Sequence, residues 1–450
     1  MLCAAVALCW PAFLNHYPLI FPDSVSYLGD GRGVARALFL HRPLGMEPGR
    51  SEFYSLGIFP FNLGLSPWPI VALNAALTAW VLWLVVRSLL PRATAGTYLL
   101  LVAGLSALTS VSWYVCFLMP DILGPLVYLA IYLLVFARET LSGAERWGLA
   151  VLALWGITAH ATHLMLAMGL LLLLVLLWVL VRRVPALRGA ISGAGLVRVA
   201  LLIAVAMAAQ MGLHAYLYRR PSLFGNHPPY LMARIIADGP GTLYLQQHCA
   251  SLDWAICKSV GHLPDNDDDF LWTDGGVWSS ADKATQQRLM AEEMPLVLAT
   301  VRAYPRMQAA RSWANFIGQI QDFGVNDFDN NDWMQQQLPL VIPNAATRYA
   351  RSLQARSAVP TQRFTRLQRW IVIPAAVLAV VLLPWIWLRR RHRLLGLAVV
   401  VLPALVANAL VTAVLSSSDS RYQARVIWLL PLLAALIAMD LLTARRGVRV

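Results

Sequence analysis

The chain has 450 residues, of which 58% are hydrophobic and only 13% are charged. Soluble domains carry roughly 25% charged residues, so this composition excludes an ordinary soluble protein and indicates an integral membrane protein. The net charge of +13 does not indicate nucleic-acid binding, because the basic residues form short clusters between hydrophobic runs, as membrane-topology signals do.

Hydrophobic runs long enough to cross a bilayer recur along the chain. The first lacks a basic start and a small-x-small cleavage site, so we interpret it as a retained span rather than a signal peptide. Trp147 to Leu180 contains no charged residue and is too long for one ordinary span, which predicts a fold-back at the polar segment 158–163. The sequence therefore predicts about ten spans, at roughly 2–20, 67–86, 94–115, 120–137, 147–163, 164–181, 194–217, 370–388, 394–415 and 426–443.

Arginine clusters follow every second predicted span. With ten spans all of these clusters lie on one side, and the positive-inside rule makes that side cytoplasmic. We therefore expect a multi-pass protein of a bacterial inner membrane, with both termini in the cytoplasm and the functional loops facing the periplasm. The clusters are Arg87 and Arg92; Arg138 and Arg146; Arg182, Arg183 and Arg188; Arg389, Arg390, Arg391 and Arg393; and Arg445, Arg446 and Arg449.

The long segment 218–369, between spans seven and eight, is predicted to be an extracytoplasmic loop domain with mixed helical and irregular structure. It separates a seven-span module (1–217) from a three-span module (370–450). Cys249 and Cys257 lie eight residues apart in this loop. An oxidising compartment favours a disulfide between them, and two free thiols are the alternative.

Two acidic stretches are predicted at the extracytoplasmic ends of spans. In Phe21-Pro-Asp-Ser-Val-Ser-Tyr27, Pro22 and Asp23 suit the first turn of a helix, with Asp23 and Tyr27 on one face. Asp121 follows Pro120 at the start of a span. Each carboxylate is either a helix cap or a functional group at the membrane surface, with Asp23 as a candidate general base.

His160 and His163 form a third polar stretch, at the predicted fold-back. Their spacing places both imidazoles on one helical face, as a metal pair or a phosphate-binding pair requires. Two histidines are an incomplete metal site, so a divalent cation such as Mg²⁺ or Mn²⁺ would need a carboxylate such as Asp121 as well. A polar hairpin tip satisfied by water is the alternative.

Arg421, Tyr422 and Arg425 precede the last span at the same predicted face. Arginine side chains suit phosphate or pyrophosphate groups, and Arg42 in the first loop is a further candidate. Ordinary interfacial anchoring is the alternative. Because ionisable groups at a membrane boundary are costly unless they have partners, the coincidence of these stretches on one face predicts a functional site.

This layout resembles the GT-C superfamily of membrane glycosyltransferases, which use polyprenyl-phosphate sugars. That family has a catalytic Asp or Glu just after the first span, a second acidic residue early in the following outer loops, and a large loop after span seven. Here those places hold Asp23, Asp121 and residues 218–369. Asp23 is followed by Ser rather than by the second acidic residue of several relatives, and ten spans are fewer than is common in the family.

The resemblance implies an all-α polytopic membrane enzyme of GT-C type. It would transfer a sugar, with inversion, from a polyprenyl-phosphate donor to a lipid or glycan acceptor at the extracytoplasmic face. Asp23 would deprotonate the acceptor hydroxyl, and Asp121 with the histidines would orient the base, hold the phosphate or complete a divalent-cation site. The substrate- and phosphate-binding residues would be Tyr27, Arg42, His160, His163, Arg421, Tyr422 and Arg425.

Two other classes of function remain open. A transporter or flippase for a lipid-linked substrate would place ionisable groups at mid-membrane and carry broken helices and inverted repeats. A non-catalytic envelope-assembly protein would use the large loop only to bind a partner. In every case the expected surroundings are membrane lipids, with no nucleic acid.

Overall fold

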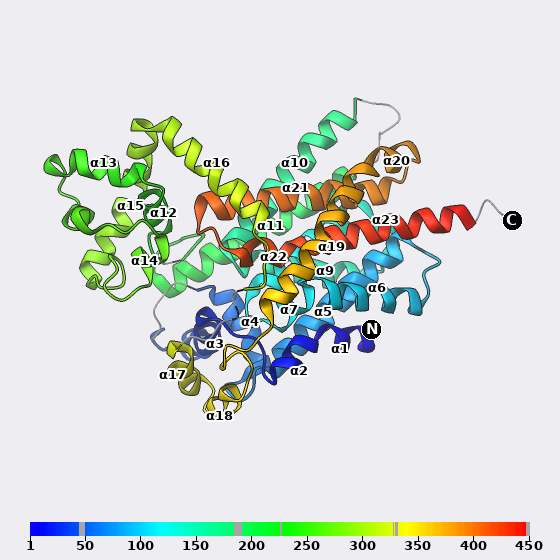
Figure 1. Cartoon of the computed structure of the whole chain (residues 1–450), viewed down its shortest axis with the longest axis horizontal. Helices are drawn as coiled ribbons and strands as arrows, with labels where there is room; N and C mark the ends of the chain where they lie inside the picture. Colours follow the sequence, from blue (N-terminus) through cyan, green and yellow to red (C-terminus); the bar gives the residue numbers. More distant parts are fainter. Residues whose placement is uncertain (45–49, 184–190, 226, 327, 329–331, 447–450) are drawn as a thin grey trace.

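The computed structural model describes residues 1–44, 50–183, 191–225, 227–326, 328 and 332–446. Within these ranges the chain forms α-helices and short 3-10 helices and no β-strand, apart from one isolated bridge between Leu19 and Phe117. Figure 1 shows a long helical bundle with a smaller group of helices at one end. The predicted all-helical class is confirmed.

Six segments of the described chain are long and apolar enough to cross a membrane, which identifies a membrane protein. Two shorter apolar segments lie among them, and α9 (Gly143–Thr158) packs against α8, α10 and α11. The short η2 (Arg138–Thr140) follows α8. The six long segments are α5 (Trp68–Leu89), α10 (Ala161–Val181), α11 (Gly193–Tyr218), α19 (Thr361–Val381), α21 (His392–Leu415) and Ser420–Leu442, which comprises α22 (Ser420–Ile427) and most of α23 (Leu429–Arg446). The two shorter segments are α6 (Ala95–Leu108) and Pro120–Phe136, which comprises η1 (Pro120–Ile122) and α8 (Leu123–Phe136).

Several of the predicted spans are not single helices, the first and the third among them. The first is divided into α1 (Leu2–Leu8) and α2 (Trp10–Asn15). Pro11 has no N–H to donate to the preceding turn, so the helix restarts with proline in its first turn. The third is divided into α6 and α7 (Val111–Cys116), because the Thr109 hydroxyl bonds the Leu105 carbonyl at 2.6 Å and the backbone of Thr109 is extended.

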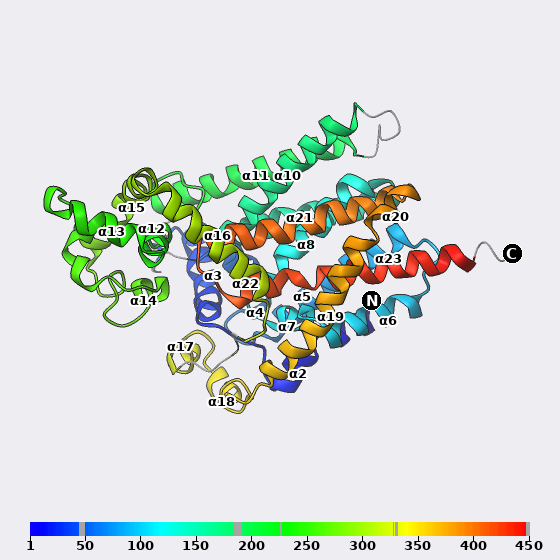
Figure 2. The same cartoon turned by 45° about the horizontal axis from the view of Figure 1, so that its top comes forward.

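Two helices of the predicted first loop cover the end of the bundle that faces the smaller group of helices. They are α3 (Pro22–Leu40) and α4 (Glu52–Asn62), and Figure 2 shows α3 running crosswise to the bundle helices. They pack closely because Gly31 has no side chain: a Cβ there would lie 2.4 Å from the Ser55 carbonyl oxygen. The α17 helix (Asp332–Val341) packs on α3, and α18 (Ala345–Ala350) on α17.

The smaller group of helices, residues 230–303, is called the cap domain below. It contains α12 (Tyr230–Ala237), α13 (Pro240–His248), η4 (Cys249–Ser251), η5 (Ala255–His262), α14 (Asp267–Leu271) and α15 (Lys283–Ala303). It has its own hydrophobic core, which includes Met232, Ile236, Leu245, Ile256, Phe270 and Leu296.

The predicted disulfide is confirmed: Cys249 and Cys257 are bonded, with Cα atoms 5.4 Å apart. The rest of the predicted loop domain belongs with the bundle, since buried residues between Phe323 and Tyr349 pack in the main core. After the cap domain, α16 (Pro305–Gln321) returns to the bundle and packs on α21, and α20 (Leu383–Leu388) lies at the opposite end (Figure 1).

Candidate functional site

The short helix α22 supplies the cationic side of the site. Asp419 caps it by accepting a hydrogen bond from the Arg421 backbone N–H at 3.0 Å. The helix then places Arg421 and Arg425 one turn apart on one face. Both side chains are buried, so α22 brings two positive charges into the interior of the protein.

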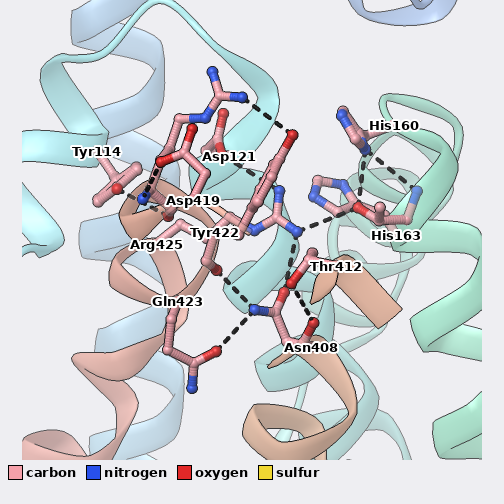
Figure 3. Close-up of polar contacts among 12 residues, drawn as sticks. Tyr114, Asp121, His160, His163, Asn408, Thr412, Asp419, Tyr422, Gln423 and Arg425 are labelled. Carbon is pink, nitrogen blue, oxygen red and sulfur yellow. Dashed lines mark hydrogen bonds and ion pairs between the residues drawn. The ribbon is translucent and has the colours of Figure 1, made fainter. Parts of the chain in front are cut away.

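Arg425 binds three elements together. Its Nη1 donates to Asp121 Oδ1 at 3.3 Å, while Nη2 donates to Thr162 Oγ1 at 3.2 Å and to Asn408 Oδ1 at 3.0 Å (Figure 3). The side chains of Arg425 and Asp121 are 1% and 3% exposed. A buried ion pair persists only when hydrogen bonds compensate its desolvation, and Thr162 and Asn408 provide them here.

The histidine pair lies directly beside this ion pair. The predicted fold-back is present: α9 ends at Thr158, and His160 caps α10 by accepting from the Thr162 backbone N–H at 3.2 Å. The two imidazole rings are 5.4 Å apart. His163 is 1% exposed, which excludes a solvated hairpin tip at this residue.

One ring nitrogen of His163 is hydrogen-bonded and the other is not. Nδ1 bonds the Gly156 carbonyl at 2.8 Å, whereas Nε2 is buried and has no hydrogen-bond partner among the described residues. Because Nδ1 must donate to a carbonyl, Nε2 of the neutral ring is an acceptor. The His163 ring can lie close to α8 because residue 124 is glycine: a Cβ at Gly124 would lie 2.9 Å from His163 Nε2.

Arg421 is held by aromatic rings instead of a carboxylate. Its guanidinium lies 4.3 Å from the Phe21 ring centroid and 5.0 Å from that of Tyr422, and Nη2 donates to the Tyr422 hydroxyl at 3.3 Å. Nε and Nη1 are buried and lack a hydrogen-bond partner within the described part of the chain. Buried donors are nearly always paired, so these two indicate a place where an anionic ligand would bind.

Asp23 lies in the first turn of α3, as predicted, and forms an ion pair with Arg50. Asp23 Oδ1 accepts a hydrogen bond from Arg50, and the Asp23 side chain is 16% exposed. Arg50 also donates to the Tyr230 hydroxyl at 3.4 Å and lies 5.2 Å from the Trp272 ring centroid. The cap domain therefore touches the acidic side of the site directly.

These groups belong to one site. Arg421 lies within electrostatic range of both Asp23 and Asp121. The buried Tyr27 of α3 interacts with the same two carboxylates, and burial followed by the charge of Asp23 raises the pKa of Tyr27 well above its usual value. Tyr27 is therefore a neutral hydroxyl between the two acidic residues.

Arg42 and the predicted metal ligands are not assembled at this site. Arg42 lies beyond the far end of α3, roughly 27 Å from Asp23 along the helix axis. The described residues contain no group of three or more His, Cys, Asp or Glu side chains that could hold a metal ion. Asp121 is bound to Arg425 instead of joining His160 and His163 as a ligand set, so we assign no step to a metal.

Several residues of the site were not predicted from the sequence, and three of them show why. Arg50 is an isolated arginine in the first loop, with no local pattern that pairs it with Asp23. Asn408 interrupts an apolar run, and a polar side chain inside a span is a usable signal. Gln319 of α16, 1% exposed, bonds both backbone groups of Asp419, at 2.7 Å to the carbonyl and 3.0 Å to the N–H.

Comparison with known proteins gives no relative: no protein-family model, curated protein or solved structure matches this chain. The fold and the site therefore define its class: an all-helical membrane protein with a buried, charged site at the end of the bundle that carries the cap domain.

Proposed function

We propose that this protein is a glycosyltransferase of the GT-C type, which transfers a sugar from a polyprenyl-phosphate donor to a lipid or glycan acceptor. One observation carries the proposal. Two buried guanidinium nitrogens of Arg421 have no partner among the described residues, and they lie within electrostatic range of Asp23 and Asp121. Such a cation suits the phosphate of a lipid-linked sugar, and a carboxylate nearby suits a general base.

The chemistry is a single displacement. The Asp23 carboxylate takes the proton of the acceptor hydroxyl, and the hydroxyl oxygen forms a bond to the anomeric carbon. The bond between this carbon and the phosphate oxygen breaks, its electron pair leaves with the polyprenyl phosphate, and the configuration inverts. Arg421 stabilises the charge that develops on the leaving phosphate, which is the largest barrier-lowering effect expected in a buried site.

The other groups hold this arrangement. Arg50 forms an ion pair with Asp23 and orients its carboxylate, and Arg425 adds positive charge while bonded to Asp121. His163 Nε2 accepts a hydrogen bond from a sugar hydroxyl of the bound donor. Tyr230 and Trp272 of the cap domain lie on the Asp23 side, where the acceptor enters.

The proposal includes the membrane topology. We infer ten crossings of a bacterial inner membrane, in which α1–α2, α6–α7, η1–α8 and α9 add to the six long apolar segments, with both termini cytoplasmic and the site facing the periplasm. In support, α1, α20 and the end of α23 all lie away from the cap domain, and Arg389 to Arg393 follow α20 (Figure 1).

The test is a transfer assay with purified protein, a panel of polyprenyl-phosphate sugars, and lipid and glycan acceptors. Asp23→Asn should lower the rate at least about 100-fold, since the loss of a general base costs 10²–10⁴. The matched control is Asp30→Asn, the same substitution two turns further along α3, which should keep the wild-type rate. Near-wild-type transfer by Asp23→Asn would remove Asp23 from the role of base, and no transfer by wild-type protein with any donor would refute the proposed function.

A further inference from the structure

A second cationic site lies at the opposite end of α3 from Asp23. It is a pocket of about 430 Å³ between the end of α3 and the end of α11, lined among others by His41, Arg42, Tyr216 and Arg219. This volume is within the usual range for small-ligand sites. Because α3 is 19 residues long, the pocket is separate from the site around Asp23 and Asp121.

The pocket is held together by an oriented hydrogen-bond chain. The Tyr216 hydroxyl donates to the Ala37 carbonyl at 3.2 Å, so its single proton is used there. His41 Nδ1, 2.8 Å from the same hydroxyl, must then be the donor of that contact. These two hydrogen bonds hold the His41 side chain against α11 and leave the His41 Nε2 atom for another partner.

Among the described residues, nothing compensates the charge of the pocket. Arg42 and Arg219 form no ion pair with any residue that the structure describes, and none of the side chains that line the pocket is acidic. Both arginines are exposed, and each presents a planar fork of donors that matches a phosphate group.

The position of the pocket identifies the kind of anion. Arg219 directly follows α11, a spanning segment whose outer surface carries exposed apolar residues such as Leu201 and Val205. Phe39 and Leu40, which directly precede the pocket residue His41 at the end of α3, are 74% and 61% exposed. Apolar side chains beside arginines and a tyrosine at the end of a span are typical of the depth of lipid headgroups.

We propose that this pocket binds a phosphate group, supplied by the headgroup of an anionic phospholipid, between Arg42, Arg219 and His41. Phe39 and Leu40 would contact the acyl chains of the same lipid. This site is independent of the proposed glycosyl transfer. It would anchor the far end of α3, the helix whose first turn holds Asp23, to the end of α11.

The experiment measures lipid retention by native mass spectrometry on the full chain in detergent, with phosphatidic acid, phosphatidylglycerol or phosphatidylcholine added. The double variant Arg42→Ala/Arg219→Ala should retain at least about fivefold less of the anionic lipids than wild type. The matched control is Arg36→Ala/Arg220→Ala, which removes the same charge from the same two segments outside the pocket and should behave as wild type. Arg42→Glu is a second variant with the same expected loss.

Inorganic phosphate distinguishes the two sources of the anion. If it displaces the lipid only from proteins with an intact pocket, the phosphate group itself is recognised; if it binds alone and the lipids do not, the pocket takes free phosphate. Equal lipid retention by wild type and Arg42→Ala/Arg219→Ala, or an equal loss in the control pair, would overturn the proposal. Thermal unfolding without lipid verifies that every variant is folded.

Discussion

Replacing Arg425 with Met should destabilise the protein strongly, because the Asp121 carboxylate would stay buried without its cation. The two side chains are 1% and 3% exposed. Removal of one partner of a buried ion pair costs about 3–5 kcal/mol. Asn408 and Thr162 would also lose the donor that binds them. Met has a similar shape to the aliphatic part of Arg, so little of the loss comes from a cavity.

A double-mutant cycle separates this charge effect from general damage. Asp121→Asn removes the buried charge, so the double variant with Arg425→Met should lose less stability than the sum of the single variants, with a coupling energy of about 2–3 kcal/mol. Detergent-induced unfolding followed by tryptophan fluorescence measures each free energy.

The control cycle uses Arg87 and Glu145, an ion pair at the other end of the bundle, whose side chains are 34% and 20% exposed. Its coupling should not exceed about 1 kcal/mol, because solvent screens the pair. A coupling at Asp121 and Arg425 no larger than this would refute the inference that their ion pair is desolvated and mutually dependent.

Three further predictions concern stability. Asp30→Asn should raise the unfolding temperature at pH 8 but not at pH 4. Burial and then the Glu52 carboxylate raise the pKa of Asp30 to about 7, above its value of about 4 in the unfolded chain. Ionisation of Asp30 therefore lowers the free energy of unfolding as pH rises between these two values, by at most about 4 kcal/mol. Equal unfolding temperatures at pH 8 would contradict this. Gln319→Ala should cost about 1–3 kcal/mol of unfolding free energy by leaving buried backbone groups unpaired, whereas the exposed Gln321→Ala should cost almost nothing. Reduction of the disulfide should destabilise the cap domain by about 2–3 kcal/mol and expose it to protease, and an unchanged cleavage pattern, read by mass spectrometry, would argue against this.

Local signals in the sequence predicted local features of the structure. Composition and hydropathy indicated a helical membrane protein, and Pro22 with Asp23 indicated the start of α3. The uncharged run through the two histidines predicted the fold-back between α9 and α10. These features depend on neighbouring residues, so a short stretch of sequence contains the information.

Contacts between distant segments could not be predicted in this way. Arg50, just before α4, reaches Asp23 on α3, a helix that packs closely on α4 at Gly31, and nothing near Asp23 in the sequence indicates that partner. The sequence groups Arg42 with Arg421 and Arg425 because the length of the first loop does not show in which direction its residues run. The structure shows one helix of 19 residues between Asp23 and Arg42, which carries them to opposite ends.

The cap domain is connected to both sides of the candidate site. On the acidic side, Tyr230 accepts a hydrogen bond from Arg50, the partner of Asp23. On the cationic side, Gln319 of α16, the helix that continues from the cap domain, bonds the backbone of Asp419, which caps the helix of Arg421. A shift of the cap domain would therefore change the distance between Asp23 and Arg421. In the proposed reaction that distance decides whether donor and acceptor can react, so we propose that the cap domain is a structural part of the site and that acceptor binding completes the site through it.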